Sequence, residues 1–347
     1  MAVALAFVAP KKIEFVEEAD PPVGPGEVRL RTLFSGISAG TALTVYRGSN
    51  PYLSKTWDAE RRLFTAGAGE VRGYPKVEGY QEVGEIVEVG AGVNDLVVGQ
   101  KVFGIWGHRE GKVVTAEYAR PRLLPAHVPP MHGIFSRMGD IALNAILDGQ
   151  INLGETVAIF GLGIIGQLTV QLARLSGATV IAVDLVPRRR ELAQKLGADV
   201  VLDGRAGAAE EIKRLTGNRG ADLCIEASGA NRALHEAIRA CAYSSRVVAT
   251  GFYQGEGTGL LLGDEFHHNR IEIVCSQISG VNTALRHRWS RERLTEVFMK
   301  LVADGRVQVE PLVSHVVPFR EAAPLFDIID TRTDEVMQGV LAFGGAA

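Results

Sequence analysis

A strand-like run followed by closely spaced glycines offers the clearest chemistry in this chain. In TVAIFGLGIIGQ the spacing is Gly161-x-Gly163-x-x-Gly166, between an apolar strand pattern and a helix pattern. That context is typical of a dinucleotide-binding βαβ unit, in which glycines permit a tight turn, close approach of a pyrophosphate and close packing of helix on strand. The start of the helix, at Ile164 and Ile165, would present free N–H groups to the phosphates. A glycine turn in a purely structural α/β protein is the alternative, and the context disfavours it.

A carboxylate at the end of the next strand pattern bears on the choice of dinucleotide. TVIAVD ends at Asp184, 18 residues after Gly166. A carboxylate there accepts hydrogen bonds from the ribose hydroxyls and repels a 2′-phosphate, which predicts NAD, with NADP disfavoured. Residues 188–190, all arginine, favour the opposite, because guanidinium groups would bind a 2′-phosphate. Asp184 has more weight because it stands at the strand end itself. We also assign Arg189, Ala227, Ser228 and Gly251 to the cofactor site.

The elements that must position these residues change in character along the chain. Up to about residue 130, short strand patterns between glycine-rich turns indicate a partly open barrel, and residues 48–73 predict a long loop. From about residue 155, short apolar runs alternate with amphipathic helix patterns, which predicts six parallel strands covered on both faces. After a helix pattern at 290–304, the strand VMQGVLAF returns to the first type of structure. We therefore expect one domain from residues 1–137 and 281–347, and a dinucleotide-binding domain from 138–280.

Composition narrows the possible partners. The formal net charge is −3 and no basic stripe stands out, which argues against nucleic acid. No apolar run approaches the roughly 18 residues needed to span a membrane, so we expect a small-molecule substrate and no membrane partner. The cysteines Cys224, Cys241 and Cys275 have neither disulfide nor zinc spacing. We expect all three to be buried, in a protein of the reducing cytoplasm.

The order of these parts resembles the medium-chain dehydrogenase/reductase superfamily over essentially the whole chain. The resemblance rests on FSGISAGT (34–41), YPKVEGYQEVGEIVEVGAGV (74–93), the glycine motif, ADLCIEASG (221–229) and PLVSHVVPF (311–319). It implies an α/β protein, with a doubly wound Rossmann domain beside a β-rich, GroES-like catalytic domain. It also implies a nicotinamide-dependent oxidoreductase.

The resemblance breaks at the metal site of the zinc-dependent members. Where they carry a cysteine, a histidine and a third ligand, this chain has Ser38, Tyr80 and Ser136. Hydroxyls are poor zinc ligands beside thiolate and imidazole, so we expect no catalytic zinc. The four-cysteine structural loop of many members is also missing. SGISAGT with GY in place of GH resembles a zinc-free branch that includes bacteriochlorophyllide dehydrogenases, although Ala42 stands where that branch often carries an acid.

Without zinc, another group must polarise a carbonyl or take up a hydroxyl proton. We expect Tyr80 to do so, with Ser38 and Ser136 adding hydrogen bonds; Tyr80 as a side chain that fills the vacated space is the equally weighted alternative. His108, in a glycine-bounded loop, could reach the site. His267 and His268 either face the nicotinamide or cap a turn, and we favour the turn; Asp140 either lines the cofactor cleft or caps the next helix, and we favour the cap.

These observations predict an NAD(H)-dependent enzyme that interconverts an alcohol and a carbonyl by hydride transfer without zinc. An NADPH-dependent enoyl or quinone reductase is the second hypothesis, and a non-catalytic dinucleotide-binding redox sensor is the third. In related dehydrogenases the strand before the last pairs across a two-fold axis. GLLLG (259–263) occupies that place as an apolar edge strand, which predicts a homodimer or homotetramer.

Overall fold

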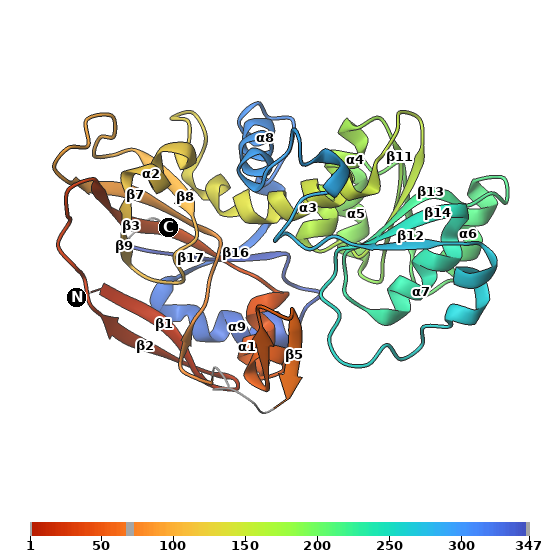
Figure 1. The fold of residues 1–347 in the computed structure, drawn as a ribbon, viewed down its shortest axis with the longest axis horizontal. Helices are drawn as coiled ribbons and strands as arrows, with labels where there is room; N and C mark the ends of the chain where they lie inside the picture. The colour runs from red at the N-terminus through yellow and green to blue at the C-terminus, as the bar shows by residue number, and fades with distance from the viewer. Residues whose placement is uncertain (1, 67–72, 345–347) are drawn as a thin grey trace. The chain divides into compact units, whose positions relative to one another are not determined.

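The structure, a computed structural model, describes residues 2–66 and 73–344 (Figure 1). Contacts between residues divide the chain into two compact units. Residues 1–136 and 313–347 form one, which we call the mixed-sheet unit, and residues 137–312 form the other, the parallel-sheet unit. No helix among the described residues is both long and apolar enough to cross a membrane.

Six parallel strands form the sheet of the parallel-sheet unit, in the order β12-β11-β10-β13-β14-β15. The predicted six-stranded parallel sheet is therefore confirmed, and the order reverses between β10 and β13, where doubly wound folds bind their ligands. The strands are β10 (Thr156–Phe160), β11 (Thr179–Asp184), β12 (Val200–Asp203), β13 (Ala221–Glu226), β14 (Cys241–Ala249) and β15 (Glu272–Cys275). The helices are α3 (Ser136–Gly149), α4 (Ile164–Leu175), α5 (Pro187–Lys195), α6 (Ala208–Leu215), α7 (Asn231–Ala240) and α8 (Arg291–Ala303).

Burial on both faces explains why the central strand is apolar along its whole length. Residues 157–160 of β10 are all buried, and alternate ones, Ala158 and Phe160, pack with residues of α6 and α7. Helix α4 contacts β10 and β11 in the same unit, and its residues 166–173 are buried. A strand covered by helices on both faces has no solvent-facing side, so its sequence does not alternate between apolar and polar.

The mixed-sheet unit contains a six-stranded sheet with the order β16-β17-β3-β7-β8, in which β9 also pairs with β3. Its strands are β3 (Glu27–Ile37), β7 (Glu82–Val89), β8 (Lys101–Gly104), β9 (Gly111–Thr115), β16 (Val313–Pro318) and β17 (Gln338–Ala342). A second sheet has the order β2-β1-β6, from β1 (Ala2–Ala9), β2 (Lys12–Glu18) and β6 (Lys76–Val77). The helices are α1 (Thr41–Arg47), α2 (Ala116–Ala119) and α9 (Ala322–Thr331).

The segment predicted as a long loop at residues 48–73 contains regular structure. Strands β4 (Lys55–Asp58) and β5 (Leu63–Ala66) form an antiparallel hairpin, in which Trp57 packs its ring against Phe64 with 4.9 Å between centroids. Residues 67–72 of the segment lie outside the described residues. The prediction was wrong for 55–66 because the segment has too few residues per strand to show a period.

Residues 281–312 also differ from the expectation, which placed them with the β-rich domain. They pack in the parallel-sheet unit. Phe298 of α8 lies against α3 so closely that a Cβ at Gly139 would be 2.0 Å from its ring. The side chain of Gln171 exchanges two hydrogen bonds with the main chain of Gln308, at 2.7 and 3.0 Å. These tertiary contacts, rather than the sequence order, decide the assignment.

Two predictions about the edge of the parallel sheet are wrong. GLLLG forms no strand: Gly259 has a φ of +85°, and the chain enters a π-helical turn at Leu262–Phe266. The edge strand is β15 instead, and Cys275 at its end is exposed, whereas Cys224 and Cys241 are buried. An edge strand is covered less completely than the central strands, which explains the exposed thiol.

Candidate functional site

The glycine turn after β10 leaves room for a phosphate-sized group. Gly161 has a φ of +89°, and a Cβ there would be 2.7 Å from the main-chain nitrogen of Ser228. A Cβ at Gly166 would lie 1.9 Å from the carbonyl oxygen of Gly161, so helix and strand pack too closely for a side chain. Gly163 precedes α4, has no capping side chain, and has no described atom within 4 Å of an added Cβ. This combination of two crowded glycines and one open one fits a pyrophosphate at the helix N-terminus.

Asp184 lies beside this turn, at the end of β11. Its side chain accepts hydrogen bonds from the main-chain N–H groups of Leu162, at 2.6 Å, and Val186, at 2.8 Å. Arg189 is 4.0 Å from the same carboxylate. Arg190 is turned elsewhere, donating to the main-chain oxygen of Asp184 at 2.8 Å and pairing with a carboxylate of β12. The negative charge at the strand end is therefore held against the glycine turn, where a ribose would be recognised.

A glutamate that the sequence analysis did not select organises the loop after β13. Glu226 is fully buried and accepts hydrogen bonds from Ser228 N–H (2.8 Å), Gly229 N–H (3.0 Å) and the Tyr253 hydroxyl. Burial raises the pKa of Glu226, and these hydrogen bonds oppose that rise. Gly251 N–H also donates to its main-chain oxygen, at 3.1 Å. The signal for Glu226 was its place at a strand end, beside the Ala227 and Ser228 assigned to the cofactor.

In the mixed-sheet unit, the hydroxyls of Tyr80 and Ser38 are joined by a hydrogen bond of 2.5 Å. The pairing of β3 with β7 brings them together: Ser35 stands opposite Glu82 in the ladder, and Gly36 N–H donates to the carbonyl of Gln81 just beyond it. Ser38 follows the end of β3, and Tyr80 precedes the start of β7. Two residues that are far apart in sequence are therefore neighbours because the strands are antiparallel.

Ser136, the third hydroxyl assigned to this site, begins α3 and is 4% exposed. It is the last residue of the first stretch of the mixed-sheet unit. Ala42, where the zinc-free branch often carries an acid, is buried in α1 and presents no charge.

The donor set at the position of the catalytic metal is neutral. It consists of hydroxyls, and the neighbouring Gln81 supplies an amide that is fully buried and makes no hydrogen bond with the described residues. Within residues 2–66 and 73–344, no group of three or more His, Cys, Asp or Glu side chains could hold a metal ion. Zinc sites in proteins are built from thiolates, imidazoles and carboxylates, so the residues present do not fit a zinc ion.

A second polar cluster lies one step further along the β3–β7 ladder. Ser35, Glu82 and His108 are all fully buried. The Ser35 Oγ is 2.9 Å from Glu82 Oε1 and 2.6 Å from His108 Nδ1. Burial raises the pKa of Glu82 and lowers that of His108 to about 4. His108 was expected to be able to reach the site from a loop; in the structure its side chain is fully buried against Ser35.

The other polar residues selected from the sequence are Asp140, His267 and His268, and each makes contacts within the parallel-sheet unit. Asp140 does not cap a helix, because α3 begins four residues earlier; it lies inside the helix and accepts a hydrogen bond from Thr295 at 3.0 Å. His268 Nδ1 lies 3.0 Å from the main-chain oxygen of Asp264, within the π-helical turn, and its ring is 5.3 Å from that of His267.

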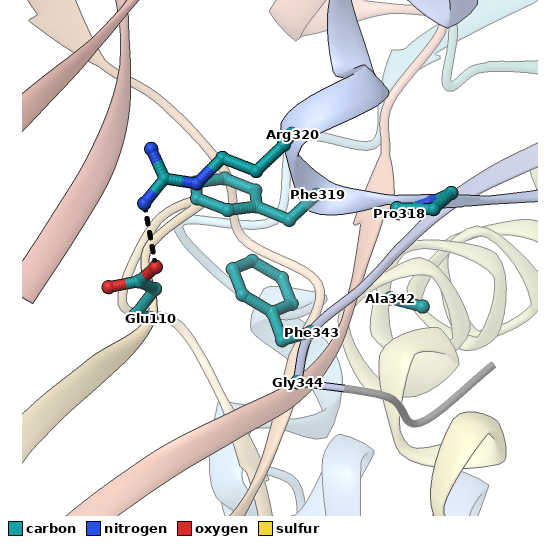
Figure 2. Close-up of a pocket in the computed structure, with 7 residues that line it drawn as sticks. All are labelled: Glu110, Pro318, Phe319, Arg320, Ala342, Phe343 and Gly344. Atoms are coloured by element: carbon teal, nitrogen blue, oxygen red, sulfur yellow. Dashed lines mark hydrogen bonds and ion pairs between the residues drawn. The ribbon is translucent and has the colours of Figure 1, made fainter.

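A surface cavity of about 200 Å³ in the mixed-sheet unit does not include any of the assigned residues (Figure 2). The rings of Phe319 and Phe343 stack along one side, 4.3 Å apart. Above them Arg320 reaches Glu110, with a hydrogen bond of 3.0 Å (Figure 2). The other lining residues are Pro318, Ala342 and Gly344. The ion pair and the two stacked rings line this hollow, and the rings belong to the residues that directly follow β16 and β17. We interpret the hollow as a packing feature.

Comparison with known proteins agrees with this fold. The family model described as "Zinc-binding dehydrogenase" matches residues 165–296. D-guloside 3-dehydrogenase of Escherichia coli strain K12 is 32% identical, over 91% of this chain and 92% of that protein. L-threonine 3-dehydrogenase of Pyrococcus horikoshii is 29% identical, over 87% of each chain.

Among solved structures, a short chain alcohol dehydrogenase of Escherichia coli CFT073, complexed with NADH, has the same fold. Its TM-score is 0.77 at 21% identity, over 99% of both chains. The dinucleotide turn, the six-stranded parallel sheet and the identity to D-guloside 3-dehydrogenase across nine-tenths of both chains lead to one assignment. This protein belongs to the medium-chain dehydrogenase/reductase superfamily and is an oxidoreductase.

Proposed function

We propose that this enzyme is an NAD(H)-dependent dehydrogenase that interconverts a secondary alcohol and a ketone on a small, polyhydroxylated molecule, without catalytic zinc. The similarity to a D-guloside 3-dehydrogenase supports a sugar-like substrate. The neutral hydroxyls at the metal position support a mechanism that does not use zinc.

The cofactor preference rests on Asp184. Gly161, Gly163 and Gly166 would hold the pyrophosphate, and Asp184 would accept hydrogen bonds from the adenosine ribose. A 2′-phosphate would meet that carboxylate, while Arg190 is already paired with Asp203 and the main chain. NADPH-dependent enoyl or quinone reduction is therefore the weaker hypothesis. When bound, the nicotinamide ring accepts or supplies the hydride.

The hydrogen bond between Tyr80 and Ser38 is the observation that carries the chemical proposal. Tyr80 donates its proton to Ser38 Oγ, so the proton of Ser38 is the one directed to a substrate oxygen, and Ser38 takes the proton of Tyr80 as it gives up its own. A ketone oxygen gains negative charge as it is reduced, and a donor held in place beforehand stabilises that charge. In the opposite direction, the pair first loses one proton to water and then accepts the proton of the alcohol. Ser136, buried at the start of α3, supplies a further hydroxyl.

Replacing Tyr80 with phenylalanine tests this role, because the ring is kept and only the hydroxyl is lost. We expect kcat to fall about 10²–10³-fold. NADH affinity should stay the same, since the glycine turn and Asp184 lie in the other unit. Tyr52→Phe is the matched control: Tyr52 is an exposed tyrosine of the same unit, and its variant should keep the wild-type rate. Unchanged turnover in Tyr80→Phe would mean that Tyr80 only fills space.

Metal analysis tests the zinc-independent part separately. The protein purified without added metal should contain far less than one zinc per chain, and chelators should leave the rate unchanged. Near-stoichiometric zinc that is lost together with activity would refute this part of the proposal, whatever the result for Tyr80.

A further inference from the structure

Glu82, Ser35 and His108 form a row of buried polar side chains that the mechanism above does not use. Each has 0% exposure. The row crosses from β7 to β3 and then to the loop after β8. Buried polar groups in a protein interior destabilise the fold unless all are hydrogen-bonded, so such a row needs a reason.

The protons of this row can be assigned from the number of donors. Glu82 accepts hydrogen bonds from Trp106 N–H, at 2.8 Å, and from Ser35, at 2.9 Å. Burial raises the pKa of Glu82, and the nearby main-chain N–H groups of Gln81 and Gly107 oppose that rise. Ser35 donates to Oε1 and Trp106 N–H donates to Oε2, so the carboxyl is an acceptor at both oxygens, which describes the ionised form.

Ser35 has one proton, and it is used toward Glu82. Its oxygen must then accept from His108, so the ring proton of His108 is on Nδ1. His108 Nε2 is left as a bare acceptor, and it has no hydrogen-bond partner among the described residues. The row therefore consists of one anion and one neutral imidazole of defined tautomer.

The row is attached to the main chain on both sides of Tyr80. Before it, His108 N–H donates to the carbonyl of Glu78 at 2.9 Å. A Cβ at Gly79 would lie 2.7 Å from His108 N and 2.8 Å from Glu82 Oε1. After it, Gly36 N–H donates to the carbonyl of Gln81 at 2.8 Å, just beyond the point where Ser35 and Glu82 pair in the ladder. The main chain is therefore held shortly before and shortly after Tyr80, at Glu78 and at Gln81, beside this buried cluster.

We propose that ionised Glu82, fixed by Ser35 and His108, is a positioning residue that keeps the Tyr80 hydroxyl on Ser38. This inference rests on the proposed role of Tyr80 as proton donor. Glu82 acts through the main chain of the tyrosine rather than by touching substrate. A donor displaced by about 1 Å can lose about 10²-fold in rate, so small changes in the cluster should be visible in kcat.

A double-mutant cycle tests the inference. Glu82→Gln keeps the shape but presents an amide donor to N–H groups, so we expect kcat to fall about 10–10²-fold with NADH affinity unchanged. In a Tyr80→Phe background the same change should cause no further fall, because the group being positioned is gone. Asp330→Asn is the control: this carboxylate of the same unit, 6% exposed and paired with Lys11 and Arg47, should affect stability but not kcat.

Each outcome separates the two proposals. If Tyr80→Phe alone leaves kcat unchanged, the proposed role of Tyr80 fails. If Tyr80→Phe lowers kcat and the Glu82→Gln effect is the same in both backgrounds, or absent in both, the positioning inference fails and the role of Tyr80 stands. Should Glu82→Gln not fold, Ser35→Ala takes its place in the same cycle, with the same expected loss of effect in Tyr80→Phe.

Nitrogen NMR of histidine-labelled protein gives a readout that does not depend on activity. The resonance that disappears in His108→Gln should show a neutral ring protonated at Nδ1 at pH 7. A ring protonated at Nε2 would mean that Ser35 donates to the imidazole and that Glu82 carries a proton, which would overturn the inference.

Discussion

Acid should weaken the mixed-sheet unit through His108. Burial lowers the pKa of this side chain from an ordinary 6.5 to about 4. In the unfolded chain the ring takes up a proton as the pH falls below about 6.5, whereas in the folded protein it stays neutral until about pH 4. The difference of about 2.5 pH units corresponds to about 3 kcal/mol of unfolding free energy. This stability is fully present above pH 6.5 and is lost as the pH falls from 6.5 to 4.

Urea unfolding of wild-type protein and His108→Gln, at pH 7 and at pH 4, measures this loss. Trp57 and Trp106 lie in this unit and Trp289 lies in the other, so both proteins carry Trp289→Phe and their tryptophan fluorescence reports on the mixed-sheet unit. The wild type should lose about 3 kcal/mol more than the variant between the two pH values. The raised pKa of Glu82 acts in the opposite direction, because the folded carboxyl gains its proton first, and it is present in both proteins. Equal losses in the two proteins would show that His108 accepts a proton without unfolding.

Three further predictions concern binding and assembly. Asp184→Ala should narrow the preference for NADH over NADPH by about 10–10²-fold in calorimetry, because charge-assisted hydrogen bonds to the ribose are lost; a wild type that prefers NADPH would contradict this. Gly163→Ala should weaken NADH binding without lowering the melting temperature, since its Cβ meets no described atom. Gly280→Ala, at an equally open position, is the control and should change neither NADH binding nor the melting temperature. The β15 edge, where Ile273 is 37% exposed, should join two copies, so sedimentation at micromolar concentration should show a dimer or tetramer and not a monomer.

The parallel sheet could be predicted from sequence because burial on both faces leaves a plain signal. TVAIF in β10 is apolar without alternation, and the glycine turn and α4 follow it directly. GLLLG has the same apolar character, but Gly259 takes a left-handed φ and the chain turns. Hydrophobicity alone does not distinguish an edge strand from a bend, which is why that prediction failed.

Contacts between distant segments were the part that the sequence could not supply. The amphipathic pattern at 290–304 predicted a helix, and α8 is that helix, but nothing in its period indicates that Phe298 packs on Gly139. Asp140 was interpreted as a cap from local chemistry alone. Its partner Thr295 is more than 150 residues away, and only the fold brings the two together.

The residues of the candidate site also fall into those that the sequence could indicate and those that only the fold brings together. Ser38 and Tyr80 could be selected because each replaces a metal ligand within a recognisable motif. Glu82 lies within the motif at 74–93 but replaces no metal ligand, and His108 lies outside the quoted motifs; they meet through Ser35 because β3 and β7 pair in one register. Shifting that register by one residue would turn Ser35 and Glu82 to opposite faces, so the cluster is a property of the ladder rather than of local sequence.

The acidity of a phenol predicts which direction of the reaction is faster at neutral pH. A free phenol has a pKa near 10, so at neutral pH it is a ready donor and a slow base. The neighbouring groups that the structure describes are the Ser38 hydroxyl and the buried Gln81 amide, and neither is a base at neutral pH. We therefore expect ketone reduction to be faster than alcohol oxidation in initial-rate measurements at pH 7, and raising the pH should accelerate oxidation. Faster oxidation at pH 7 would mean that another group, such as Ser136 or a bound water, accepts the proton.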